Sequence, residues 1–205
     1  MSPQRWMELM RRLGIGENLE MFKRVLDSYF EPHRHYHTGA HIDACLHAFD
    51  SARFLAESEG EVEAALWFHD MVYDPRASDN ERASADIASQ FLASEGLPSP
   101  ACARVHALVI ATMHDKEPTE QDSRLVVDID LSILGQDPKV YDQFELAIRE
   151  EYEWVPWPLY CQKRAEILRS FLDRKSIYLT EPLRERYEPP ARINLECAIS
   201  KLTNV

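Results

Sequence analysis

His69 and Asp70 form a polar pair within the otherwise largely apolar stretch from Trp67 to Tyr73. An ionised carboxylate in such surroundings needs a cation or hydrogen bonds, because desolvating it alone costs several kcal/mol or more. Neutral imidazole and carboxylate are also common ligands of Mg²⁺ and of first-row divalent ions. The pair therefore predicts a metal site in the interior of the protein.

Further ligands of these types occur in two other apolar segments. His41 lies near the start of a helix expected over residues 38–57, on the edge of its apolar face and beside Cys45. Two aspartates, Asp128 and Asp130, interrupt the apolar run 125–134. Mixed His and Asp ligands that leave coordination positions open are typical of hydrolytic ions, which bind and acidify a water. Taken alone, His41 equally fits a core histidine bonded to a carbonyl, and Asp128 fits a helix cap or a partner of a ligand histidine.

The order His41, then His69-Asp70, then an aspartate resembles the HD superfamily of metal-dependent phosphohydrolases. Asp128-Ile129-Asp130 is similar to the Asp-x-Asp of HD nucleotide hydrolases, in which the second aspartate is the ligand. The resemblance therefore implies a metal site made of His41, His69, Asp70 and Asp130. It also implies one divalent ion, with Mn, Mg, Fe, Co, Ni and Zn all left open.

Residues 36–41, Tyr-His-Thr-Gly-Ala-His, resemble the Tyr-His-Asn-x-x-His element of cyclic-nucleotide phosphodiesterases, with Thr38 in place of Asn. In those enzymes the second histidine binds metal and the first is a phosphate ligand or general acid. This resemblance assigns His41 to the metal and His37 to catalysis. Glu81 is a second catalytic candidate, although an acidic residue in the first turn of a helix equally fits a partner of the helix dipole.

Three segments together look like a bacterial branch of predicted HD phosphohydrolases: residues 67–74, 79–81 and 130–135. That likeness extends from about residue 30 to residue 200, and it implies an all-α fold with five core helices plus additions. A second His-Asp pair, His114-Asp115, abuts Lys-Glu-Pro and is typical of a solvated helix end, from which His114 can reach the pocket rim.

The elements that must position these residues are helices, because apolar residues recur at helical spacing along the chain and alternating strand patterns are almost absent. The run 125–134 fits a buried helix, with a strand as the alternative because of its β-branched content. We expect one all-α, HD-type domain over residues 1–205, with its core at about 30–180 and terminal helices packed on it. The helices are expected at about 2–14, 17–30, 38–57, from 61 through the stretch that begins at Trp67 to the turn-rich link 73–79, and at 80–95, 99–114, 125–134, 138–153, 157–174 and 190–202.

The composition restricts the partners. A net charge of −12 argues against nucleic acid and against an anionic membrane surface, both of which reward Lys and Arg. The 4 cysteines have no paired spacing, which favours reduced thiols in a cytoplasmic protein. No signal-peptide pattern and no apolar run of membrane-spanning length are evident. Arg34, Lys163 and Arg164 could meet phosphate oxygens or serve only the fold.

These features predict a phosphohydrolase that cleaves a phosphate ester or anhydride by a metal-activated water. The expected substrate is a nucleotide or another small phosphorylated metabolite. Two alternatives stay open: a di-iron HD-type oxygenase, for which His114 could supply one extra ligand, and a non-catalytic module that binds a metal or nucleotide. The sequence leaves the oligomeric state undetermined.

Overall fold

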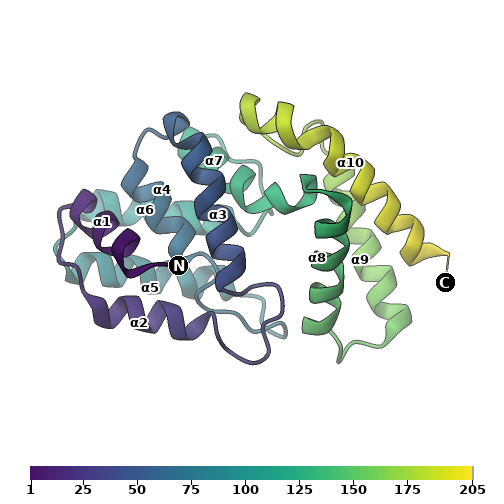
Figure 1. Ribbon diagram of the computed structural model, residues 1–205, viewed down its shortest axis with the longest axis horizontal. Coiled ribbons are helices and arrows are strands. Elements are labelled where there is room, and N and C mark those ends of the chain that lie inside the picture. The colour runs from purple at the N-terminus through teal and green to yellow at the C-terminus, as the bar shows by residue number, and fades with distance from the viewer. Residues whose placement is uncertain (205) are drawn as a thin grey trace. The chain divides into compact units, whose positions relative to one another are not determined.

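The computed structural model describes residues 1–204, and it contains helices and no strand in this range (Figure 1). The predicted all-α class is therefore confirmed. The chain divides after Asp130 into two compact units, residues 1–130 and 131–205, which are described separately here. The expectation of one domain spanning residues 1–205 stays a prediction. Among the described residues, no helix combines the length and the apolar character that crossing a membrane requires.

The first unit is built from seven α-helices and one short 3-10 helix. Their ends follow ordinary capping chemistry: the Ser2 side chain accepts a hydrogen bond from the Arg5 amide, and Gly14 ends the first helix in the left-handed region at φ 73°. The elements are α1 (Pro3–Leu13), α2 (Leu19–Ser28), α3 (Gly39–Ala52), η1 (Arg53–Leu55), α4 (Glu59–Phe68), α5 (Asn80–Ser94), α6 (Ser99–Ala111) and α7 (Gln121–Asp130).

Helix α4 is the centre of this unit. Every residue from Gly60 to Phe68 is buried, and α4 packs on α1, α3, α5, α6 and α7. Its Trp67 ring meets the Trp6 ring of α1 edge to face, with centroids 5.5 Å apart. Because residues on all sides of α4 are buried, Glu61 and Glu63 included, the helix has to be surrounded by other elements. The residues that directly follow α4, His69 and Asp70, are therefore delivered to the interior.

The second unit contains η2 (Leu131–Gly135), α8 (Pro138–Glu151), α9 (Trp157–Leu172) and α10 (Glu181–Thr203). Helix α10 packs on α9 and on η2. At Gly135 a Cβ atom would lie 2.6 Å from the backbone oxygen of Tyr187, so only glycine permits this close approach of η2 to α10.

Several predicted boundaries need correction. The helix predicted over 38–57 ends at Ala52 and continues only as η1. The last helix begins at Glu181 instead of residue 190 and contains Pro189 and Pro190. These prolines remove two amide donors, and the carbonyls four residues earlier belong to exposed residues that water can satisfy. The segment 125–134 is helical, as α7 followed by η2, and the strand alternative is wrong.

Candidate metal centre

Three helices of the first unit bring the predicted ligands together. His41 lies in the first turn of α3, His69 and Asp70 directly follow α4, and Asp130 is the last residue of α7. These helices pack on one another in all three pairs. We refer to His41, His69, Asp70 and Asp130 as the His/Asp cluster.

The donor atoms of the His/Asp cluster surround a single point. The two Nε2 atoms of His41 and His69 lie 3.2 Å apart. Asp70 Oδ2 lies 3.4 Å from His41 Nε2 and 3.1 Å from His69 Nε2, and Asp130 Oδ1 lies 3.2 and 3.5 Å from the same atoms. Ligands about 2.1 Å from one ion are about 3.0 Å apart at right angles and about 3.4 Å apart at the tetrahedral angle. The measured separations fit donors arranged around a divalent ion.

Hydrogen bonding at His69 supports the same conclusion. Its Nδ1 lies 3.1 Å from the carbonyl oxygen of Leu66, a contact that requires the proton on Nδ1. In the neutral ring, Nε2 then presents a lone pair toward His41 and toward the oxygens of both carboxylates. Lone pairs that face carboxylate oxygens repel one another unless a proton or a metal ion lies between them. A backbone carbonyl that fixes the tautomer of a ligand histidine is typical of metal sites.

The electrostatics of the cluster show how strongly it favours positive charge. Burial disfavours the charged form of His69, yet Asp70 and the hydrogen bonds to both carboxylates outweigh it, so the pKa of His69 is raised well above its usual value. Burial alone would raise the pKa of Asp130, but hydrogen bonds from His114, His41 and His69 hold it well below the usual range. The pKa of Asp70 is likewise lowered well below its usual value. Both carboxylates are therefore ionised and need positive charge beside them.

Side-chain exposure differs within the cluster. The side chains of Asp70 and Asp130 are each 15% exposed, whereas that of His69 is 1% exposed. The two carboxylates are therefore the more accessible donors of the cluster.

One neighbour of the cluster, Cys45, had not been assigned as a donor from the sequence. Cys45 lies one helical turn after His41 and is buried, with Sγ 3.7 Å from His41 Nε2. With His41, His69 and Asp130 it forms a group whose ligand atoms all lie within 4.8 Å of one another and could hold a metal ion. Its spacing of four residues from His41 on one helix was the available signal.

His114 contacts the cluster from outside. Its Nε2 lies 2.9 Å from Asp130 Oδ2, while Asp130 Oδ1 faces His41 and His69. His114 follows the end of α6 with φ 56°, a left-handed conformation that is uncommon for residues other than glycine. This backbone bend turns the imidazole toward Asp130 and orients that carboxylate.

The two predicted catalytic residues differ in their placement. His37 lies in the loop before α3, with its ring centroid 6.2 Å from that of His41 and 4.1 Å from that of Tyr73. Glu81 lies in the first turn of α5, and among the described residues it makes no hydrogen bond or ion pair with the cluster. His37 thus lies close to the cluster, and the catalytic roles of His37 and Glu81 both stay predictions.

The remaining polar candidates are engaged elsewhere. Asp128 is fully buried, and of the pair Asp128 and Asp130 it is Asp130 whose carboxylate oxygen lies 3.2 Å from His41 Nε2 and 3.5 Å from His69 Nε2. In the second unit, Arg164 pairs with Glu145 at 2.7 Å, and the exposed Lys163 pairs with Glu166 at 2.9 Å. Lys163 and Arg164 thus form ion pairs within α8 and α9.

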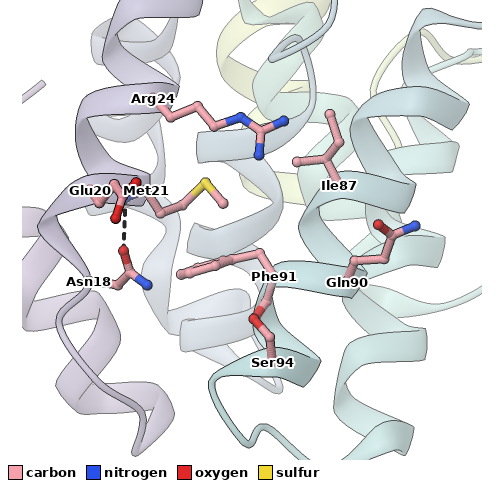
Figure 2. Close-up of a pocket in the computed structure, with 8 residues that line it drawn as sticks. All are labelled: Asn18, Glu20, Met21, Arg24, Ile87, Gln90, Phe91 and Ser94. Carbon is pink, nitrogen blue, oxygen red and sulfur yellow. Dashed lines mark hydrogen bonds between the residues drawn. The ribbon is translucent and has the colours of Figure 1, made fainter.

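A separate hollow lies between α2 and α5 (Figure 2). It has a volume of about 360 Å³, with Met21, Ile87 and Phe91 on its apolar side and Arg24 and Gln90 among its polar residues. None of its lining residues belongs to the His/Asp cluster.

Comparison of the chain with models of known protein families, with curated proteins and with solved structures finds no match.

Proposed function

We propose that the protein is a metal-dependent phosphohydrolase whose ion is held by the His/Asp cluster. The observation that carries the proposal is the convergence of two imidazole nitrogens and two ionised carboxylates, from three helices, at separations of 3.1–3.5 Å. The order of these residues along the chain, which resembles the HD superfamily, supports the same activity.

The donor set is suited to a hydrolytic ion. Imidazole suits Mn, Fe, Co, Ni and Zn, and carboxylate extends the range to Mg. When bound, a divalent ion supplies Lewis acidity and lowers the pKa of water, so that hydroxide becomes available near neutral pH. The exposed side of Asp70 and Asp130 provides the approach for a small phosphorylated molecule.

The residues of the chain have distinct tasks in this proposal. His69 keeps its lone pair toward the site because Leu66 holds its other nitrogen. His114 orients Asp130 through the carboxylate oxygen that does not face the histidines. His37 protonates the leaving oxygen, a contribution that is typically worth about 10²–10⁴-fold in rate. The proposed substrate is a phosphate ester or anhydride, with a nucleotide as the first choice.

A metal-supplemented substrate screen tests this function. Metal-free protein is incubated with Mn²⁺, Mg²⁺, Co²⁺, Ni²⁺ or Zn²⁺ and with a panel of phosphorylated metabolites, and released phosphate is measured. We expect turnover that His69→Ala and Asp70→Ala abolish and that His37→Gln lowers about 10²–10⁴-fold. The exposed His106 pairs with Asp86 away from the cluster, so His106→Ala is the matched control. Equal phosphate release by wild type and both cluster variants would contradict the proposal.

A further inference from the structure

Arg34 is a buried cation placed between the loop that carries His37 and the turn that carries Asp70. Its side chain is fully buried. Nη1 donates to the carbonyl oxygens of His37 at 3.1 Å and of Asp70 at 2.6 Å. Nη2 donates to the carbonyl of Met71 at 2.9 Å, and Nε donates to Glu31 at 2.9 Å. One guanidinium group thus holds the backbone on both sides of the candidate site.

Aromatic contacts reinforce the same connection. The guanidinium carbon of Arg34 lies 5.2 Å from the ring centroid of Tyr29 and 5.5 Å from that of Tyr73. The Tyr29 hydroxyl donates to the carbonyl of Trp67 at 2.9 Å, and the Tyr73 ring stacks on His37 at 27°. The loop before α3 is therefore tied to the end of α4 by both polar and aromatic contacts.

We propose that Arg34 is a positioning residue that holds His37 in register with the His/Asp cluster. The inference rests on the proposed function, and it assigns no substrate contact to Arg34. A guanidinium has five N–H donors, and all three of its nitrogens donate here to groups of the protein itself. Four of the five N–H groups are therefore committed to the protein itself, three of them to the backbone, which fits a positioning role.

The geometry requires arginine instead of another cation. The planar fork of arginine reaches several carbonyls in fixed directions, whereas the ammonium group of lysine is a single compact charge on a flexible stem. Lysine at position 34 would keep the charge but could not hold the carbonyls of His37, Asp70 and Met71 together. A displacement of about 1 Å at a catalytic group can cost about 100-fold in rate.

The test compares wild type, Arg34→Lys and a matched control. Arg192 also donates to several backbone carbonyls, but in the second unit, so Arg192→Lys repeats the same chemical change away from the cluster. Three quantities are measured: the Kd for Mn²⁺ by calorimetry, the ring signals of ¹⁵N-labelled His37 by NMR, and kcat and KM for Mn²⁺-dependent hydrolysis of 4-nitrophenyl phosphate.

Arg34→Lys is expected to shift the His37 ring signals, to raise the Kd for Mn²⁺ up to about 10-fold, and to lower kcat about 10–100-fold with KM within about 3-fold. Arg192→Lys should leave all three unchanged. If Arg34→Lys does not fold, Tyr73→Leu replaces it. This change removes the ring that contacts both Arg34 and His37 but keeps the hydrogen bonds of the guanidinium group. We expect it to change the His37 signals, the Kd and kcat in the same directions by smaller amounts.

The outcomes separate this inference from the proposed function. Wild-type protein that binds Mn²⁺ but hydrolyses no phosphorylated compound contradicts the proposed function, while the Kd and the His37 signals still test Arg34. Unchanged His37 signals and an unchanged Kd in folded Arg34→Lys or Tyr73→Leu would overturn the inference.

Discussion

Two groups of buried charge in the first unit differ in how their carboxylates are balanced. Glu63, in the middle of α4, has a side chain only 2% exposed, and it receives Arg5 at 2.7 Å, Arg12 at 2.8 Å and Arg53 at 3.2 Å. We call these four residues the Glu63 cluster. The His/Asp cluster, just beyond the end of the same helix, has two ionised carboxylates that face imidazoles.

The two clusters differ in whether permanent charges of the protein neutralise their carboxylates. Guanidinium groups are always charged, so Glu63 is neutralised by permanent cations of the protein. Imidazoles carry only a removable proton, and the Nε2 atoms of His41 and His69 face the carboxylate oxygens of Asp70 and Asp130. The Glu63 cluster is therefore balanced by permanent cations of the protein, whereas His41, His69 and Asp130 belong to a group that could hold a metal ion.

Removing a ligand should produce the largest effect. Asp70→Asn and His69→Ala are each expected to weaken Mn²⁺ or Co²⁺ binding more than about 100-fold, since changes to mere partners of ligands already cost about 10–100-fold. Calorimetric titration of metal-free protein measures the change, with His106→Ala as the control. Tight binding that persists in both ligand variants would place the ion elsewhere.

Removing the carboxylate of the Glu63 cluster should lower the stability of the protein and leave its metal binding unchanged. Glu63→Gln leaves three guanidinium groups without their common partner, so we expect a loss of about 3 kcal/mol in the free energy of unfolding, measured with urea. Metal bound per folded molecule should stay the same. In metal-free protein, Asp70→Asn should cost less stability than Glu63→Gln, because the two imidazoles keep Asp130 as a partner and can release their protons. Equal destabilisation by Glu63→Gln and Asp70→Asn would remove the distinction between the two clusters.

His114 allows a smaller and more selective change. Its φ of 56° suits glycine, so His114→Gly removes the imidazole without forcing a new side chain into a left-handed conformation. We expect metal affinity to fall about 10–100-fold while thermal stability of the metal-free protein changes little. An unchanged affinity would show that Asp130 needs no orienting partner.

Asp50, at the edge of the Glu63 cluster, should show the smallest effect. Partial burial disfavours its charge, but hydrogen bonds from Arg5 and Arg53 outweigh this and lower its pKa. Its contribution to stability is therefore present above the ordinary Asp pKa of about 3.9 and is lost as the pH falls through the lowered folded-state pKa. Because the side chain is 45% exposed, solvent screening limits the loss in Asp50→Asn to less than about 1 kcal/mol at pH 7. Urea unfolding at pH 7 and pH 3 checks it; a difference that grows toward pH 3 would contradict the sign.

The sequence predicted the helices and the cluster in different ways. Periodic apolar residues are sufficient to identify helices, and the apolar flanks of His69-Asp70 indicated an interior site. Asp130 was chosen over Asp128 through resemblance to HD hydrolases, and the structure places it against His41 and His69.

Other features depend on tertiary contacts that a sequence does not display. The orientation of His114 follows from a left-handed turn at a residue other than glycine. The role of Arg34 follows from carbonyl groups contributed by a segment more than 30 residues away. Helix α10 continues through Pro189 and Pro190, because water can satisfy the carbonyls that the two prolines leave without a donor. Local helix propensity alone does not indicate this.

Anomalous diffraction from crystals of the metal-loaded protein tests the central claim most directly. Data collected at the absorption edge of Mn or Co should give one strong peak about 2.0–2.3 Å from the Nε2 atoms of His41 and His69 and from an oxygen each of Asp70 and Asp130. A loaded protein whose anomalous peak lies away from these atoms, or that shows no peak, would contradict the account.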